Sequence, residues 1–212
     1  MNIKSLLVTA LVVSLLFSSA ALAVPISGLY NTGVDNLGNA LVPAGVPDPH
    51  YSVIASPSGL FTPVTVDAAN YPFPYWISNN AFSRWIGPAA TYANGPAGNY
   101  TYRTTFSLPV NAILGSVSIS GLWGTDDPGT DILINGASTS QTSLGFTTLT
   151  SFSITSGFVT GLNTIDFLLT NAGGPTGLRV DQIQGNYQVP EPTGLVTALA
   201  GALLMLRRRF RS

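Results

Sequence analysis

The chain has 212 residues, with eight Lys and Arg, nine Asp and Glu, and no cysteine. Its length allows one domain with a substantial core, and that core must supply the stability because no disulfide can form. Between Val24 and Val189 lie three arginines and eight aspartates, a net charge of 3 − 8 = −5, which excludes a cationic face for nucleic acid.

The N-terminus has the pattern of a secretory signal peptide. A basic residue precedes the apolar run Leu6–Phe17, and Ala21 and Ala23 place small residues where signal peptidase requires them. We therefore expect signal peptidase to remove residues 1–23, which leaves Val24 as the first residue of an exported protein.

The first part of the exported chain is rich in proline, which breaks helices and interrupts long strands. Seven prolines lie from Pro43 to Pro74, so only short strands fit there. We expect such strands at Tyr51–Ala55, Val64–Val66, Tyr75–Ile77 and Phe82–Ile86.

From Tyr100 onward apolar and polar residues alternate, which is typical of half-buried strands. Alternation over Tyr100–Leu108 predicts one strand, and alternation over Ser116–Ser120 predicts the next, which ends at Trp123. The same pattern predicts later strands near residues 131–134, 152–154, 165–169 and 178–187.

Turn signals separate these strands. Asp127–Thr130 has Pro and Gly in the central positions of a type II turn, and Asn135–Gly136 is typical of a two-residue hairpin turn. In the last strand the apolar phase slips at Gln182, which indicates a bulge or a sheet edge.

About nine short strands without a convincing helix predict an all-β fold, an antiparallel β-sandwich over residues 24–188. Residues 102–109 read YRTTFSLP, residues 132–136 read ILING and residues 161–165 read GLNTI. These segments resemble a strand, a hairpin and a turn that recur in this order in galactose-binding-like jelly rolls. The resemblance implies a jelly-roll domain of the kind that accompanies glycoside hydrolases, often binds sugars and often carries a structural Ca²⁺.

The C-terminal residues 189–212 contain the motif Pro190, Glu191, Pro192, then the apolar run Thr193–Leu206, then an arginine cluster that includes Arg207, Arg208 and Arg209. As a helix the 14 apolar residues would span about 21 Å, against about 30 Å of hydrocarbon in a bilayer. The run is short for a permanent anchor, so we expect transient membrane insertion. The arginines should stay cytoplasmic and leave the body of the protein outside.

This order resembles the PEP-CTERM sorting signal of Gram-negative bacteria, with matches at Pro190, Glu191 and Pro192 and at the arginine cluster. The resemblance implies that exosortase, a membrane protease, cuts an inner-membrane-inserted precursor at the motif. The protein would then reach the cell surface or the extracellular matrix, often in organisms that make exopolysaccharide. An ordinary C-terminal anchor with a proline linker is the alternative.

Three aspartates, Asp126, Asp127 and Asp131, lie close together in a loop that contains Gly and Pro. Carboxylate oxygens crowded on a loop suit Ca²⁺, although the spacing differs from that of an EF-hand. The sequence therefore permits a Ca²⁺ site here. The alternative is that Asp127 caps the turn and its neighbours are solvated.

Aromatic and cationic residues are the candidates for contacting a sugar. Three tryptophans and three tyrosines fall either in the core or on a stacking surface: Trp76, Trp85, Trp123, Tyr71, Tyr75 and Tyr92. Trp123 is favoured for stacking, because it ends a strand directly before the acidic loop. Trp85 is a further candidate. Arg84 and Arg179 are each either a ligand contact or the ion-pair partner of an aspartate.

These features together predict a non-catalytic, exported protein that interacts with extracellular polysaccharide or with surface proteins. The alternative is a structural matrix component without a discrete ligand. A secreted Asp-dependent glycosidase ranks third, because residues 24–188 contain no Glu and a glycosidase needs two carboxylates around the scissile bond. His50, the one histidine, is expected to be a strand-entry residue with a satisfied hydrogen bond.

Overall fold

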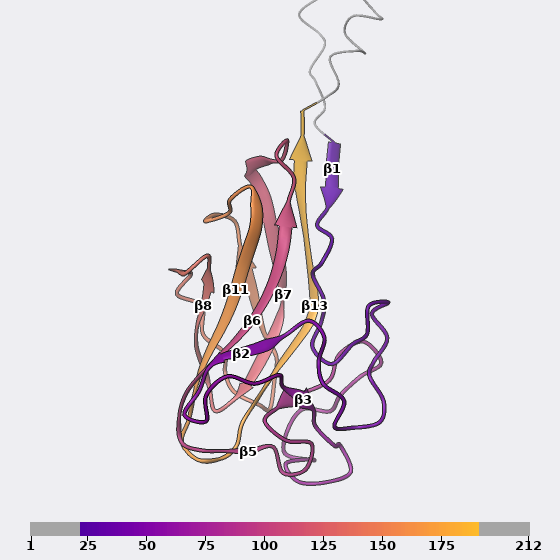
Figure 1. Cartoon of the computed structure of the whole chain (residues 1–212), viewed down its shortest axis with the longest axis vertical. Coiled ribbons are helices and arrows are strands. Elements are labelled where there is room, and N and C mark those ends of the chain that lie inside the picture. Colours follow the sequence, from indigo (N-terminus) through magenta and orange to yellow (C-terminus); the bar gives the residue numbers. More distant parts are fainter. Residues whose placement is uncertain (1–21, 191–212) are drawn as a thin grey trace, which may run out of the picture.

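A computed structural model of the chain describes residues 22–190, which form antiparallel β-strands and no helix (Figure 1). The strands are β1 (Leu22–Pro25), β2 (Ser52–Ala55), β3 (Val64–Thr65), β4 (Ile86–Gly87), β5 (Asn94–Gly95), β6 (Gly98–Leu108), β7 (Ile113–Asp126), β8 (Gly129–Ile134), β9 (Ala137–Ser138), β10 (Thr150–Ile154), β11 (Gly161–Asn171), β12 (Gly174–Pro175) and β13 (Gly177–Val189). The predicted signal peptide up to Ala21 and the predicted sorting tail from Glu191 onward lie outside these described residues.

Two main sheets share one core, which confirms the predicted antiparallel sandwich at the level of its architecture. One sheet has the order β10-β7-β13-β4-β3, with β1 beside β13, and the other has the order β2-β6-β11-β8-β9. Trp123 from the first sheet packs on Phe167 from the second, with ring centroids 5.6 Å apart. A separate pair, β5 and β12, forms a two-stranded sheet.

The alternating stretches form strands as the sequence predicts. In β6 the alternate side chains from Tyr100 to Leu108 are buried, and the strand pairs along its whole length with β11. Asn135 and Gly136 connect β8 to β9 as a two-residue hairpin with φ of 50° and 81°. The register of β13 against β7 shifts between Asp181 and Gln184, which confirms the predicted bulge at Gln182.

Two predicted strands are wrong. Residues 75–77 continue a series of turns rather than a strand, because backbone hydrogen bonds close from Asn70 to Phe73 and from Pro72 to Tyr75. Of the stretch 82–86 only Ile86 enters a strand, β4. The type II turn predicted at 127–130 is also wrong, because Gly129 and Thr130 already belong to β8 and Gly129 lacks the positive φ that such a turn requires. This segment leads from one sheet to the other, since β7 and β8 belong to different sheets.

The two ends of the described chain are paired with each other. In the register of β1 against β13, Leu22 lies opposite Val189 and Val24 opposite Tyr187. The sheet therefore begins two residues before the predicted first mature residue, and cleavage after Ala23 would shorten β1 to Val24 and Pro25.

A second, smaller core lies under the proline-rich loops. It contains Val66, Trp76, Trp85 and Ala93, with Phe73, Ile77 and Phe146 packed against it. This core lies beside the end of β7 and the start of β13, because Trp76 contacts Asp126 and Ala93 contacts Thr176 through hydrogen bonds. Figure 1 shows these loops at the bottom, opposite the chain ends. Within residues 22–190 there is no helix of the length and apolarity needed to cross a bilayer.

Candidate functional site

The two tryptophans proposed as sugar contacts are in the core, so that prediction is wrong. Trp123 and Trp85 are both 0% exposed. Trp123 fits inside because Gly129 has no side chain, and a Cβ at that glycine would lie 2.3 Å from the indole ring. Trp85 packs on Trp76 in a tilted arrangement with ring centroids 4.3 Å apart, and it donates its Nε1–H to the carbonyl of Ile77. Neither ring face is available to a ligand.

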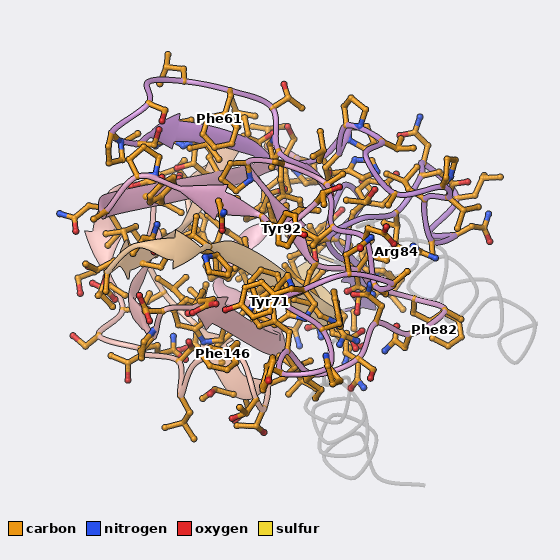
Figure 2. The ribbon with its side chains drawn as sticks, turned by 90° about the horizontal axis from the view of Figure 1, so that it is seen from below. Phe61, Tyr71, Phe82, Arg84, Tyr92 and Phe146 are labelled. Carbon is orange, nitrogen blue, oxygen red and sulfur yellow. The ribbon has the colours of Figure 1, made fainter. Side chains whose placement is uncertain are left out.

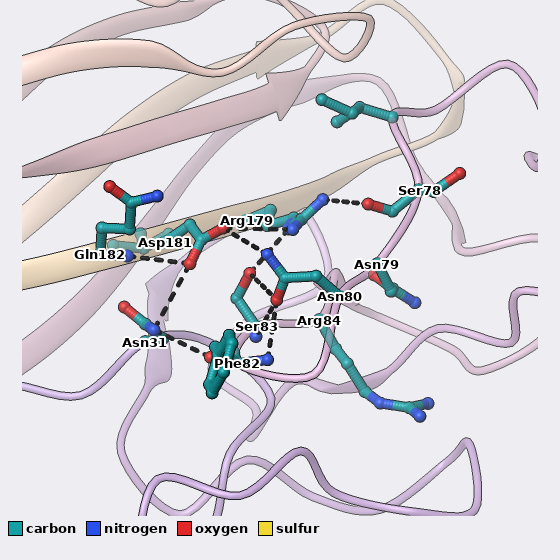
Figure 3. Close-up of polar contacts among 12 residues, drawn as sticks. Asn31, Ser78, Asn79, Asn80, Phe82, Ser83, Arg84, Arg179, Asp181 and Gln182 are labelled. Atoms are coloured by element: carbon teal, nitrogen blue, oxygen red, sulfur yellow. Dashed lines mark hydrogen bonds and ion pairs between the residues drawn. The ribbon is translucent and has the colours of Figure 1, made fainter.

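Arg179 is the partner of an aspartate rather than a ligand contact, which corrects its place among the binding residues. Its side chain is 3% exposed and its Nη2 lies 3.3 Å from Oδ2 of Asp181. Its Nε donates to Ser83 Oγ at 2.9 Å, and its Nη1 donates to the carbonyl oxygen of Ser78. Asn80 donates to the same Asp181 oxygen at 2.7 Å (Figure 3). This network fastens the loop 78–84 to β13.

The three aspartates of the acidic loop do not converge, which corrects the predicted Ca²⁺ site. Asp126 accepts a hydrogen bond from Trp76 Nε1 at 2.7 Å, and Asp127 accepts one from the backbone of Ala172 at 2.7 Å. Asp131 accepts from Ser138 Oγ. Among residues 22–190 no three His, Cys, Asp or Glu side chains are grouped so as to hold a metal ion.

Asp126 is the most perturbed of these carboxyl groups. The pKa of Asp126 is raised to about 6: burial is the main cause, the hydrogen bond from Trp76 opposes the shift, and the charge of Asp127 adds to it. A buried aspartate that holds an indole N–H serves to position Trp76 in the second core. Asp126 and Asp127 are therefore both already engaged by groups of the protein itself.

Three exposed tyrosines form the surface on which the structure concentrates aromatic side chains. Tyr71, Tyr75 and Tyr92 are 47%, 67% and 53% exposed. The rings of Tyr71 and Tyr75 meet edge to face with centroids 6.0 Å apart, and those of Tyr71 and Tyr92 are tilted with centroids 6.4 Å apart. We call these three residues the tyrosine surface. Figure 2 views the molecule from that end.

The tyrosine surface rests on ordered structure although its residues come from loops. Asp67 begins a turn in which its carboxylate accepts from the backbone of Ala69 and the side chain of Asn70. The turns that follow place Phe73 and Trp76 inward, where their rings meet edge to face with centroids 6.0 Å apart. The tyrosines on either side are left facing solvent. The second core thus anchors the turns that carry Tyr71 and Tyr75.

The backbone at Tyr92 adopts a conformation that a side chain this large seldom takes. Tyr92 has φ of 63° and the buried Ala93 has φ of 47°, two successive left-handed residues without glycine. The carbonyl of Ala93 accepts from the backbone of Thr176 at 2.9 Å, and β5 follows immediately and pairs with β12. Such conformations persist only where neighbouring structure imposes them, and they gather at functional sites.

Arg84 lies on the same end of the molecule and keeps its place among the binding candidates. Its backbone is fixed by hydrogen bonds in both directions with Thr32, at 2.9 Å and 2.7 Å. Arg103 and Arg179 form the two ion pairs found within residues 22–190, and Arg84 forms none there. The Nε of Arg84 is buried without a hydrogen-bond partner in the described structure. Figure 3 shows its guanidinium turned away from the Arg179 network.

The chemistry on offer at this end is recognition. A tyrosine presents an apolar ring face and a hydroxyl that donates and accepts hydrogen bonds, and a pyranose ring presents an apolar C–H face and hydroxyls. Grouped tyrosines can therefore stack on sugar rings, and a nearby guanidinium can bind hydroxyls or acidic substituents. The sequence named these tyrosines but favoured the tryptophans. The better signal was position, because Tyr71 and Tyr75 lie next to prolines in turns, whereas Trp123 lies within a long strand.

An open depression of about 560 Å³ lies near the start of β2 and includes His50 and Arg103 in its lining. The ring of His50 stacks on Tyr30 with centroids 3.6 Å apart, and its Nε2 lies 3.2 Å from the carbonyl oxygen of Asp35. The carboxylate of Asp48 accepts from three backbone N–H groups, and burial raises its pKa. Arg103 pairs with Asp166. The polar groups here mainly hold the fold, in agreement with the expected role of His50.

No protein-family model and no curated protein sequence matches the chain. Among solved structures the chain is similar to a Stig cyclase, Fisc, from Fischerella sp. TAU, at 10% identity and a TM-score of 0.38, over 81% of this chain and 100% of that one. It is also similar to the PA14 sugar-binding domain of an RTX adhesin, at 16% identity and a TM-score of 0.26, over 66% of this chain and 96% of that one. Both TM-scores are too low to support a functional assignment, so function rests on the side chains of this chain.

Proposed function

We propose that this chain is an exported, non-catalytic protein of the cell surface or extracellular matrix that binds polysaccharide through its tyrosine surface. The observation that carries the proposal is the grouping of Tyr71, Tyr75 and Tyr92, each about half exposed or more, on loops whose neighbouring residues Phe73, Trp76 and Ala93 belong to or pack against the second core. Monomeric proteins seldom gather large aromatic rings on their surface without a partner for them. Arg84 adds a cation with no carboxylate partner within residues 22–190.

The sequence supports the destination in this proposal. The signal peptide 1–23 exports the chain, and the PEP-CTERM tail 189–212 directs exosortase processing in a Gram-negative bacterium. Val189 is the last residue of β13, and Pro190 follows it directly. The Pro-Glu-Pro motif therefore begins where the sheet ends, and processing there would leave the strands of the domain complete. The resemblance to galactose-binding-like jelly rolls gives the same ligand class.

A binding experiment with paired variants tests the proposal. The wild-type domain is screened on an array of bacterial polysaccharides, and the best ligand is titrated against Tyr75→Ala and the double variant Tyr71→Ala with Tyr75→Ala. We expect each lost ring to weaken binding about tenfold, equivalent to about 1.4 kcal/mol. Because Tyr75 is 67% exposed, its replacement should leave the melting temperature close to that of wild type.

Phe82→Ala is the matched control, because Phe82 is an exposed aromatic residue (68%) outside the tyrosine surface. It should bind like wild type. Binding that survives both tyrosine variants would move the site elsewhere on the domain. If no polysaccharide binds at all, the proposal fails and a structural matrix component is the better description.

A further inference from the structure

The end of the sandwich opposite the tyrosine surface is defined by four strand ends that meet there. Gly161, the first residue of β11, lies opposite Leu108, the last of β6. Ile113, the first residue of β7, lies opposite Gln188 near the end of β13. We call this the terminal end, because Leu22 and Val189 are paired there (Figure 1).

The terminal end carries apolar side chains that nothing in the described structure covers. Five of them are 36% to 90% exposed: Val110, Ile113, Leu114, Val159 and Leu162. They come from the start of β7, the start of β11 and the loops that precede these two strands. We call these five residues the apolar collar. Soluble monomers rarely leave such a group bare at one end unless it meets another surface.

The terminal end also lacks charge. The segments that form it and extend from it, 104–125, 132–165 and 182–190, contain no Asp, Glu, Lys or Arg. The eleven charged residues between Val24 and Val189 all lie in the rest of that chain. A neutral end can approach hydrocarbon without the large cost of dehydrating a charge, which is several kcal/mol per ion in apolar surroundings.

The position of the chain ends indicates what the collar meets. Residues 191 and 192 separate Pro190 from the apolar run Thr193–Leu206, for which the sequence predicts membrane insertion. A bilayer entered by that run must lie within a few residues of the terminal end, since an extended residue spans at most about 3.6 Å. The collar is then the part of the sandwich that the lipid reaches first.

We propose that the apolar collar rests on the lipid bilayer, with its five side chains in the interfacial region of the membrane. The sandwich then stands on the membrane with its strands leading away from it, and β13, 13 residues and about 43 Å long, separates the two ends. The tyrosine surface then faces away from the membrane. The inference rests on the C-terminal run that inserts in the membrane and is independent of sugar binding.

Single-cysteine labelling tests the contact, because the native chain contains no cysteine. The full chain carrying Val110→Cys or Leu162→Cys is labelled with an environment-sensitive dye and reconstituted in vesicles of phosphatidylcholine and phosphatidylglycerol. Leu60→Cys is the matched control: Leu60 is 76% exposed, and it lies in the loop where Pro57 contacts Gly98 at the start of β6. All three variants keep the tail, so capture of the chain by the vesicles is common to them.

We expect the dyes at 110 and 162 to shift to shorter emission wavelengths, to be quenched by nitroxide lipids and to be protected from aqueous iodide. The dye at 60 should show none of these changes. Equal iodide quenching at all three positions would overturn the proposal. A shift at 110 and 162 that appears without vesicles and grows with protein concentration would also overturn it, because the collar would then contact a second copy of the chain. Either result leaves the polysaccharide titration unaffected, so the two proposals fail separately.

Discussion

The two ends of this sandwich are built by opposite means. The tyrosine surface belongs to an end made largely of loops, yet those loops lie on a second aromatic core and are fastened to β13 by the buried pair Arg179 and Asp181. The terminal end is made of long regular strands, and within residues 22–190 it leaves apolar side chains exposed and carries no charge. Regular secondary structure therefore does not decide which end is ordered or which end binds. Loops are held in place when their side chains pack in a core, and strand ends are available for contact when their side chains do not.

The largest expected effect on stability comes from removing the arginine that holds the loop-built end on β13. Arg179→Ala should lower the free energy of unfolding by about 3–5 kcal/mol, because it leaves Asp181 buried without its cation. Hydrogen exchange should accelerate in the loop 78–84, which this arginine holds, and stay unchanged in residues 104–108. Urea unfolding measures the first effect, and exchange monitored by mass spectrometry measures the second.

Arg103→Ala is the control for that experiment. Arg103 also pairs with a buried aspartate, since the side chain of Asp166 is 4% exposed, so Arg103→Ala should destabilise the fold as well, but it should accelerate exchange in β6 and β11, which this pair joins, and not in the loop 78–84. If exchange in the loop 78–84 accelerates equally in the two arginine variants, the Arg179 network is not what holds this loop on β13.

The sequence predicted the strand-built part of the molecule well, for a physical reason. In a half-buried strand apolar and polar residues alternate with a period of two. This alternation identifies the strand at Tyr100–Leu108, and its interruption at Gln182 indicates the bulge. The loop-built end has no period. Trp76 and Trp85 pack against each other, and the turns that carry them take a geometry that depends on tertiary contacts. The local sequence does not show these contacts, so it wrongly predicts a strand at residues 75–77.

The candidate site was only half predictable from the sequence. The aromatic residue types pointed to stacking, but burial decides which of them are available, and burial is set by distant partners. Trp123 fits in the interior because Gly129 has no side chain. The sequence does not reveal this contact, because the acidic loop separates the two residues along the chain. Arg179 reaches Ser83 and the loop around it across 96 positions of sequence. Such relations appear only once the fold brings the segments together.

The next largest effect concerns the contact between Trp76 of the second core and Asp126 of the acidic loop. Asp126→Asn keeps an oxygen to accept from Trp76 but removes the charge that burial disfavours. Because the pKa of Asp126 is about 6 in the folded state against an ordinary value of 3.8, the contribution of Asp126 to wild-type stability should be fully present below about pH 4 and should be lost as pH rises to about 6. At pH 7 the variant should be more stable by about 1–2 kcal/mol, less than the full 1.4 kcal/mol per pKa unit because some solvent screens the carboxylate.

Thermal unfolding between pH 3.5 and 7.5 measures this difference. Asp35→Asn serves as a control of opposite sign, because hydrogen bonds led by that from the backbone of Asn39 lower the pKa of Asp35. Its contribution to stability is present at neutral pH and is lost as pH falls. An Asp126→Asn protein that keeps the wild-type pH dependence would show that Asp126 is not the group that titrates.

A smaller effect concerns the strained backbone of the tyrosine surface. Tyr92→Asn should raise the free energy of unfolding by about 0.5–1 kcal/mol, because asparagine adopts a φ near 63° at lower cost than tyrosine. The same change removes a ring and should weaken polysaccharide binding. Tyr75→Asn removes a ring at a residue that does not have a positive φ, so it should weaken polysaccharide binding without the gain in stability. A stability gain shared by both variants would assign it to the lost ring instead of the backbone.

The smallest expected effect is that of Ca²⁺ on the acidic loop. A cation bound at a hundred times its dissociation constant would stabilise the domain by about 2.7 kcal/mol, which is easily seen as a shift in melting temperature. Asp126 is turned inward to Trp76, while Asp127 and Asp131 accept from Ala172 and Ser138. Collecting the three carboxylates around one ion would break these hydrogen bonds, so samples in Ca²⁺ and in EDTA should melt together. A Ca²⁺-dependent rise that Asp127→Ala or Asp131→Ala abolishes would show that the loop rearranges around the ion and that the loop-built end is less fixed than its second core implies.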